Sequence, residues 1–226
     1  MRILGATALV LVSTLLAGGD AMTQPRGARV TPLPRPDLGL ELTLQKALEG
    51  RRSVREYARG ALSLAQVSNL LWAAQGVTAP GGERTAPSAG ALYPLEVYVV
   101  AGEISGLEPG IYHYQPREHA LARISATDCR ATLAAAAVRQ QWMREAPATI
   151  AIAAVLGRTA RKYHERAPRY VHMEVGAVAQ DLYLEATALG LGTVFVGAFE
   201  DAEVKRVLGL PRNEEPLALM PVGRRK

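Results

Sequence analysis

Residues 170–197 read YVHMEVGAVAQDLYLEATALGLGTVFVG, and this stretch determines the predicted architecture. Its first part predicts a long helix over about 170–189, because apolar side chains recur there at helical spacing, as at Val171, Val175, Val178 and Leu182. Gly190-Leu191-Gly192 ends that helix, and 193–196 predicts a buried strand directly after it. A dinucleotide-binding fingerprint has the opposite order, with a strand before the glycines and a helix after them. The segment therefore does not fit that fingerprint.

The rest of the chain carries shorter helical and strand patterns. Helices are predicted over 42–49, 63–74, about 127–137 and 201–208, with Ser63 as the N-cap of the second. Strands are predicted over 95–101, 110–115, 120–124, 148–156 and 217–222, and a long loop over 78–94. Because helices and strands do not alternate as repeated βαβ units, the pattern predicts one α+β domain over 42–226.

The amino-terminal residues have the pattern of an export signal. Arg2 is followed by an apolar run and then by small residues, so residues 1–21 predict a signal peptide that is too short for a comfortable membrane span. Residues 22–41 are rich in Pro, Arg and Gly and are predicted to form an extended leader. We expect an exported, periplasmic or extracellular protein without a stable membrane span in the mature chain. If Met22 is the true start, the expected location is the cytoplasm.

Composition limits the classes of protein and of site. The 226 residues are 49% apolar and 21% charged, which is ordinary for a globular protein and excludes wholesale disorder. The single cysteine, Cys129, excludes an intramolecular disulfide and cysteine-rich zinc sites, and the four histidines form no zinc-binding helix motif, so no metal is expected. The net charge of +5 is not gathered on one aromatic-rich element, so no nucleic-acid partner is expected.

The first candidate for ligand chemistry is the run Arg51-Arg52-Ser53-Val54-Arg55, which follows a helix stop at Gly50. Guanidinium groups present planar, paired donors that suit a phosphate. In an extended stretch Arg51, Ser53 and Arg55 point to the same side, which favours a shared anion site. For the run alone, the alternative is a solvated basic turn.

Two glycine-containing segments can bring backbone N–H groups close to a flat ligand. One is Pro87-Ser88-Ala89-Gly90 in the long loop, and its alternative is a plain surface loop. The other is Gly190-Leu191-Gly192, whose alternative is a helix cap. The residues alone leave both alternatives open.

The pair Lys162-Tyr163 carries side chains that donate protons when their pKa values are tuned. It lies in the basic stretch from Arg158 to Arg169, where the alternative is an exposed helix face. Cys129 is interpreted as a buried or incidental thiol, because no histidine is evidently placed to activate it.

Together these motifs resemble the FMN-dependent nitroreductases, and among them the SagB/ThcOx-type dehydrogenases. The resemblance covers about residues 42–225 and is carried, in order, by RRSVREY at 51–57, LLWAAQG at 70–76, APSAGALYPLEVY at 86–98, the stretch 170–197 and PVGR at 221–224. The first of these resembles the family's opening phosphate motif, and the third is typical of the SagB/ThcOx branch. The fourth is similar to the family's long helix and flavin-facing strand.

The resemblance implies an α+β fold with a central, mainly antiparallel sheet flanked by helices, in an intertwined homodimer with two FMN molecules at its interface. One subunit would contribute Arg51, Arg52, Ser53 and Arg55, and Arg224 would join the phosphate or ribityl contacts. The loop Pro87, Ser88, Ala89 and Gly90 would come from the other subunit. The isoalloxazine ring would be lined by Gly190, Leu191 and Gly192.

The implied activity is ping-pong oxidoreduction, in which NAD(P)H delivers a hydride to FMN and the reduced flavin passes electrons to a small organic acceptor. Lys162-Tyr163, the expected catalytic pair, resembles the proton-handling pair of the azoline oxidases in this branch. Oxidation of a modified peptide, from thiazoline or oxazoline to thiazole or oxazole, is therefore the alternative activity. A flavin-binding protein without turnover is the alternative from another class.

One segment departs from the family's pattern. The common Asn-x-Gln-Pro stretch of the nitroreductases is replaced here by Gly90-Ala91-Leu92-Tyr93-Pro94. A nitroaromatic acceptor therefore does not follow from the resemblance. NAD(P)H is scarce outside the cytoplasm, so an exported protein would call for a different physiological donor.

Overall fold

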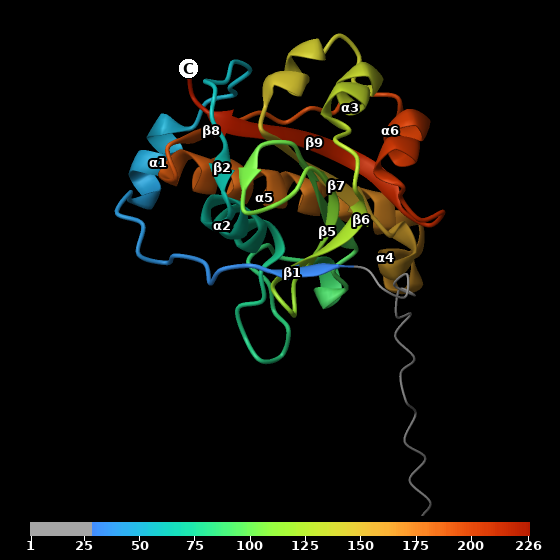
Figure 1. Ribbon diagram of the computed structural model, residues 1–226. Coiled ribbons are helices and arrows are strands. Elements are labelled where there is room, and N and C mark those ends of the chain that lie inside the picture. Colours follow the sequence, from blue (N-terminus) through green and yellow to red (C-terminus); the bar gives the residue numbers. More distant parts are fainter. Residues whose placement is uncertain (1–28) are drawn as a thin grey trace, which may run out of the picture.

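The structure is a computed structural model and describes residues 29–226, so the predicted signal peptide and the first part of the leader lie outside the described residues. Its centre is a seven-stranded sheet in the order β1-β6-β5-β3-β7-β9-β8 (Figure 1), and every neighbouring pair in it is antiparallel. The strands are β1 Val30–Pro32, β3 Leu95–Ala101, β5 Gly110–Gln115, β6 Ala120–Ser125, β7 Ala148–Ala154, β8 Leu191–Thr193 and β9 Glu215–Arg224. A separate parallel pair consists of β2 (Leu62–Ser63) and β4 (Ile104–Ser105).

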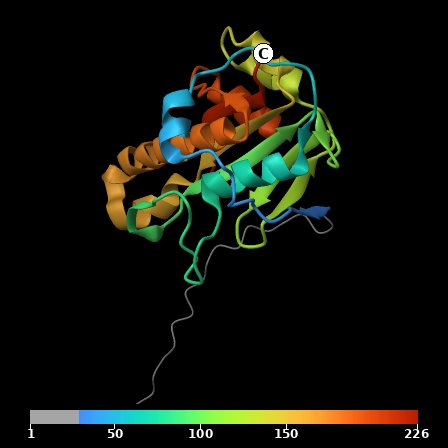
Figure 2. The same ribbon diagram turned by 90° about the vertical axis from the view of Figure 1, so that its left-hand side faces the viewer.

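Helices cover both faces of the sheet (Figure 2). One face carries α2 (Leu64–Gln75) and α5 (Ala167–Ala188), and α1 (Leu44–Gly50) packs on α5. The other face carries α3 (Arg130–Ala136) and α6 (Asp201–Leu208). The helix α4 (Leu156–Tyr163) packs against α5, and short 3-10 turns occur at Ala89–Ala91, Gln141–Glu145 and His164–Arg166. No helix in residues 29–226 is long and apolar enough to cross a bilayer.

Alternation along the buried strands produces two separate cores. In β3, Val97 and Val99 face the core under α2 and α5, whereas Tyr98 and Val100 face the core under α3 and α6. The strand β7 is buried along its whole length, which explains its continuous apolar sequence. These observations confirm the α+β architecture and the mainly antiparallel sheet.

The start of α2 has the predicted cap. The Ser63 hydroxyl accepts from the Gln66 N–H at 3.1 Å, and the Gln66 side chain accepts from the Ser63 N–H at 2.9 Å. This reciprocal pair satisfies two N–H groups that a helix start otherwise leaves without partners.

The predicted strand over 193–196 is wrong in its position. The chain is already in strand β8 at Leu191, because Leu191 and Gly192 pair with Arg224 and Gly223 of β9. Beyond Thr193 the pairing is lost, and Val196 forms only an isolated bridge with Leu219. Gly190 still ends the helix, since its φ is +70° and its N–H donates to the Thr187 carbonyl at 3.1 Å, and pairing with β9 starts the strand at the next residue.

Three further differences concern element ends. The predicted strand over 148–156 ends at Ala154, and the helix α4 begins at Leu156. Sequence analysis considered a helix here only as the alternative interpretation of the basic stretch from Arg158 to Arg169. Strand β1 was not predicted either; it lies in the leader and pairs with β6 through Val30 and Ala122. The predicted helix over 127–137 begins only at Arg130.

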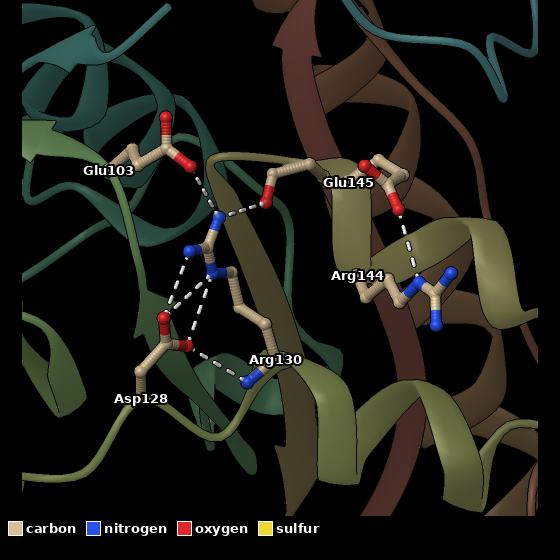
Figure 3. Close-up of polar contacts among 6 residues, drawn as sticks. Glu103, Asp128, Arg130, Arg144 and Glu145 are labelled. Carbon is tan, nitrogen blue, oxygen red and sulfur yellow. Dashed lines mark hydrogen bonds and ion pairs between the residues drawn. The ribbon is translucent and has the colours of Figure 1, made fainter. Parts of the chain in front are cut away.

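The contacts of Arg130 explain why α3 starts late (Figure 3). They also join the segment before α3 to Glu103, after β3, and to Ala146, before β7. The Asp128 carboxylate accepts from the Arg130 backbone N–H at 3.1 Å and from its guanidinium at 2.9 Å, so residues 127–129 form a turn instead of helix. The same guanidinium donates to Glu103 and to the Ala146 carbonyl, each at 3.1 Å. Helix α3 is thereby anchored to the segments on either side of it.

Candidate functional site

The arginine-rich run lies along the β8 edge of the sheet. The Val54 N–H donates to the Thr193 carbonyl at 2.9 Å, and the Ala58 N–H donates to the Arg224 carbonyl at 3.0 Å. The structure therefore brings the run together with Gly190–Gly192 and with Arg224, although these segments are more than 130 residues apart in sequence.

The three residues Gly190, Leu191 and Gly192 differ in which of their atoms can face a ligand. The Leu191 side chain is buried in the core, so only its backbone can face a ligand. A Cβ on Gly192 would lie 2.7 Å from the Cβ of Val54, so the close approach of the arginine-rich run requires glycine there. Gly190 has a φ of +70° and open space where a side chain would be.

Tyr183 on α5 organises this edge, and sequence analysis missed it. Its hydroxyl accepts from the Phe195 N–H at 2.8 Å and lies 3.1 Å from the Ser53 hydroxyl. The Arg51 guanidinium lies 5.0 Å from the centre of the Tyr183 ring, within cation–π range. In sequence Tyr183 is one more apolar position of a helix stripe, so no local signal marks this role.

The arginines of this edge are not equivalent. The Arg52 guanidinium donates to the carbonyls of Glu49 and Arg51 at 2.9 and 2.8 Å, so it caps the end of α1. Arg55 and Arg224 are exposed. Arg225, which was not predicted, donates to the Leu191 carbonyl at 2.9 Å. Arg51 is the arginine that shares a partner with Ser53, since both contact Tyr183, and this pair of donors suits a phosphate.

The loop 87–90 meets a different group of side chains. A Cβ on Gly90 would lie 2.9 Å from the Tyr163 hydroxyl and 3.0 Å from the Lys162 Nζ. The Ala89 N–H donates to the Glu174 carboxylate on α5 at 2.9 Å. Burial raises the pKa of Glu174, although the bond from Ala89 acts in the opposite direction. The predicted proton-handling pair thus lies beside the predicted flavin loop.

The backbone after Gly90 is strained. Gly90, Ala91 and Tyr93 all have positive φ values, of +64°, +54° and +45°. Two hydrogen bonds hold this stretch: the Ser88 hydroxyl accepts from the Tyr93 N–H at 2.9 Å, and Arg158 donates to the Tyr93 carbonyl at 3.0 Å. Strain of this kind concentrates at functional sites.

Arg158 connects the strained loop to a buried ionic group. Its guanidinium pairs with Glu96 at 2.5 Å, and the second Glu96 oxygen lies 2.7 Å from the His113 Nε2. Burial disfavours the Glu96 charge, but His113 and Arg158 together hold the pKa of Glu96 below its ordinary value. Since Arg158 precedes Lys162 by one helical turn, this pair also positions α4.

Comparison with known proteins identifies the family. The family model described as "Nitroreductase family" matches residues 48–224. This range includes the arginine-rich run at the β8 edge as well as the loop 87–90 with Lys162 and Tyr163. The chain belongs to the nitroreductase family.

Relatives within the nitroreductase family support this assignment. A candidate nitroreductase of Methanocaldococcus jannaschii is 50% identical over 185 residues, covering 82% of this chain and 92% of the relative. A crystal structure of a candidate nitroreductase from Ralstonia eutropha has a TM-score of 0.76 and 30% identity, with 90% and 92% of the two chains covered.

A third similar protein is named for the processing of trifolitoxin. The trifolitoxin-processing protein TfxB of Rhizobium leguminosarum is 33% identical over 133 residues, which cover 56% of this chain but only 35% of TfxB. This similarity agrees with the predicted branch of the nitroreductase family.

Within one chain of this nitroreductase-family protein the loop 87–90 and the arginine-rich run do not contact each other. The loop 87–90 contacts Glu174 near the start of α5, whereas Ser53 contacts Tyr183 nine residues later. Nine residues of helix span about 13.5 Å. Figure 1 shows α1 and β8 at one end of α5 and α4 at the other. In residues 29–226, no cluster of three or more potential ligands for a metal ion is present.

Proposed function

We propose that this protein is an FMN-dependent oxidoreductase that transfers a hydride from NAD(P)H to an organic acceptor by a ping-pong mechanism. The observation that carries the proposal is the meeting of residues 51–58 with Thr193 and Arg224 at one sheet edge. At this edge Arg51 and Ser53 both contact Tyr183, and together they form a donor pair that fits the phosphate of a mononucleotide. The exposed Arg55 and Arg224 lie on the same edge and would add their guanidiniums to it.

The chain's own residues have distinct parts in this proposal. Bound FMN would supply the hydride-accepting and hydride-donating ring. Arg51 and Ser53 would hold the phosphate. Tyr183 would orient both side chains, Arg51 through its ring and Ser53 through its hydroxyl. Lys162 and Tyr163 would donate or accept the proton of the second substrate above Gly90.

The separation of the two groups supports a homodimer. The loop 87–90 and the arginine-rich run lie at different points along α5, so a second copy would be needed to bring one loop to the other chain's arginines. Exposed apolar side chains are present for such an interface, among them Leu44 and Leu48 on α1 and Met173 on α5. We expect FMN to lie between the two subunits.

The first test is the cofactor itself. The purified protein should be yellow, should release FMN and not FAD on denaturation, and should lose its visible flavin absorbance when NADH or NADPH is added without oxygen. Colourless protein that does not take up FMN on reconstitution would overturn the proposal.

The second test weakens the phosphate contacts. The double variant Arg51→Ala, Ser53→Ala should bind FMN less tightly, with each lost charged hydrogen bond costing roughly 1.5–3 kcal/mol. Arg206→Ala is the matched control, since Arg206 is an exposed arginine on α6 paired with Glu203. Equal flavin affinity in the double variant and the control would exclude the phosphate role.

The alternative activity is azoline oxidation of a modified peptide. It is favoured by the position of Lys162 and Tyr163 over Gly90 and by the similarity to a trifolitoxin-processing protein. In that reaction the pair would handle protons while FMN accepts the hydride from the ring. Product formation from a thiazoline peptide without added NAD(P)H would select this activity over the first.

A further inference from the structure

A pocket lies directly beyond the strained loop. Its volume is about 170 Å³, and it is lined by Gly82, Glu83, Arg84, Ala91, Tyr93 and Arg117, among others. Ala91 and Tyr93 belong to the same positive-φ stretch as Gly90. This pocket is called here the Arg84 pocket. Its lining residue Ala91 directly follows Gly90, the residue that lies against Lys162 and Tyr163.

Arg84 is held in this pocket by neutral groups. Its Nη1 donates to the Gln75 side-chain oxygen at 2.6 Å, and its guanidinium carbon lies 4.6 Å from the centre of the Tyr93 ring. In the described part of the chain no carboxylate forms an ion pair with Arg84. The nearby acid Glu96 is already shared by Arg158 and His113.

A half-buried cation without an anionic partner carries a free-energy cost. Burial is the main cause that lowers the pKa of Arg84, and the attraction of Glu96 offsets it only in part. A bound anion would remove this cost, and the planar donors of guanidinium match a carboxylate or a phosphate.

A second cation borders the same pocket. Gly82 is buried with a φ of +92°, and a Cβ there would lie 3.1 Å from an Nη atom of Arg117. The absence of a side chain at Gly82 thus makes room for the Arg117 guanidinium. The exposed Glu83 also lines the pocket and opposes an anion, so the three side chains together carry one net positive charge.

We propose that the Arg84 pocket binds the carboxylate or phosphate group of the molecule that reacts beside Gly90. The pocket holds two guanidiniums and is continuous with the stretch that carries Gly90, so an anionic substituent bound there would place the rest of the molecule next to Lys162 and Tyr163. The reaction at Gly90 rests on the proposed function, whereas the binding of the anion does not.

Anion binding is tested by titrating the full chain, as purified, with benzoate and with inorganic phosphate while recording the backbone amide NMR signals of Gly82, Glu83 and Arg84. Binding of benzoate alone assigns a carboxylate, and binding of phosphate alone assigns a phosphate. Either should weaken about tenfold in Arg117→Gln and in Arg84→Gln. Glu83→Gln should bind more tightly, and Arg206→Gln should match the wild type.

Arg117 is exposed, so its substitution keeps the test valid even if Arg84→Gln fails to fold. Signals that move with neither anion, or that move equally in Arg117→Gln and the wild type, would overturn the pocket as an anion site.

The link to the reaction needs a second measurement. A quinone acceptor bearing the preferred anionic group should have a lower KM than its neutral ester. Arg117→Gln should remove the difference by raising the KM of the anionic acceptor, whereas Arg206→Gln on α6 should keep the difference and the wild-type kcat for the ester. Equal KM values with intact anion binding would overturn the link. Anion binding in a protein without any flavin activity would instead count against the proposed function.

Discussion

Gly90 lies directly beneath the phenol of Tyr163, so close that a Cβ on Gly90 would be 2.9 Å from the Tyr163 hydroxyl. The same position has a φ of +64°, which disfavours any other residue. Two independent constraints therefore select glycine at the one point where the loop, Lys162 and Tyr163 meet.

Gly90→Ala should lower both stability and turnover. The left-handed backbone conformation costs an L-residue roughly 1–2 kcal/mol, and the new methyl group displaces the Tyr163 hydroxyl and the Lys162 ammonium. Thermal unfolding and steady-state kinetics check the two effects. Gly176→Ala in α5, where a Cβ meets nothing within 4 Å, should instead raise stability by roughly 0.5–1 kcal/mol.

Removing the proton-handling groups should separate the two half-reactions. In Lys162→Ala, Tyr163→Phe, reduction of the flavin by NAD(P)H should stay near the wild-type rate. Transfer to the acceptor should slow by about 10²–10⁴, the usual contribution of general acid–base help. Stopped-flow absorbance resolves the two steps. Wild-type rates in both steps, across several acceptors, would reduce the pair to surface residues.

Gly192→Ala should destabilise the protein and weaken flavin binding, because its methyl group would overlap the Val54 side chain. Overpacking of this kind costs about 1–3 kcal/mol. The double variant Gly192→Ala, Val54→Ala should recover part of that loss, since Val54→Ala removes the opposing atoms. Chemical denaturation of the four proteins measures the coupling, and strict additivity would show that the two residues do not compete for space.

Asp181 on α5 should make stability depend on pH. Desolvation by burial raises the pKa of Asp181 to about 6, above its ordinary value, so the folded state binds this proton more tightly than the unfolded state. Stability contributed by the protonated form is therefore lost as the pH rises from about 4 to 6. Asp181→Asn should stabilise the protein at pH 7 by on the order of 1 kcal/mol.

The same pair of proteins provides the control for Asp181. At pH 4 the wild-type carboxyl is protonated and resembles the asparagine amide, so the two unfolding curves should nearly coincide there. A stability difference of the same size at pH 4 and pH 7 would mean that Asp181 acts by packing and not by its charge.

Elements with a strong local period could be predicted from the sequence. The strand over 95–101 alternates between two cores, and Ser63 with Gln66 forms the cap that their spacing indicates. Elements whose position depends on pairing with residues far away in sequence could not be predicted. The register of β8 depends on Gly223 and Arg224, and β1 exists because Val30 reaches Ala122.

The candidate site divides in the same way. The arginine-rich run, the glycine loop and Lys162-Tyr163 were predicted because each is an unusual local pattern. Tyr183 was missed because its role depends on Ser53 and Phe195, which the fold brings to it from separate segments. Arg84 was missed because its position depends on Gln75 and Tyr93 in the same way.

The place of β9 in the sheet has a consequence for synthesis of the protein. Residues 215–224 lie between β7 and β8, so the last of the described strands to be synthesised is an interior strand of the sheet. Until it emerges from the ribosome, the hydrogen-bonding edge of β7 and the apolar faces beside it lack their cover. Open strand edges invite pairing with other chains. Premature termination before β9 should therefore yield aggregates instead of a smaller folded protein, and sedimentation of a chain ending at residue 214 would reveal them.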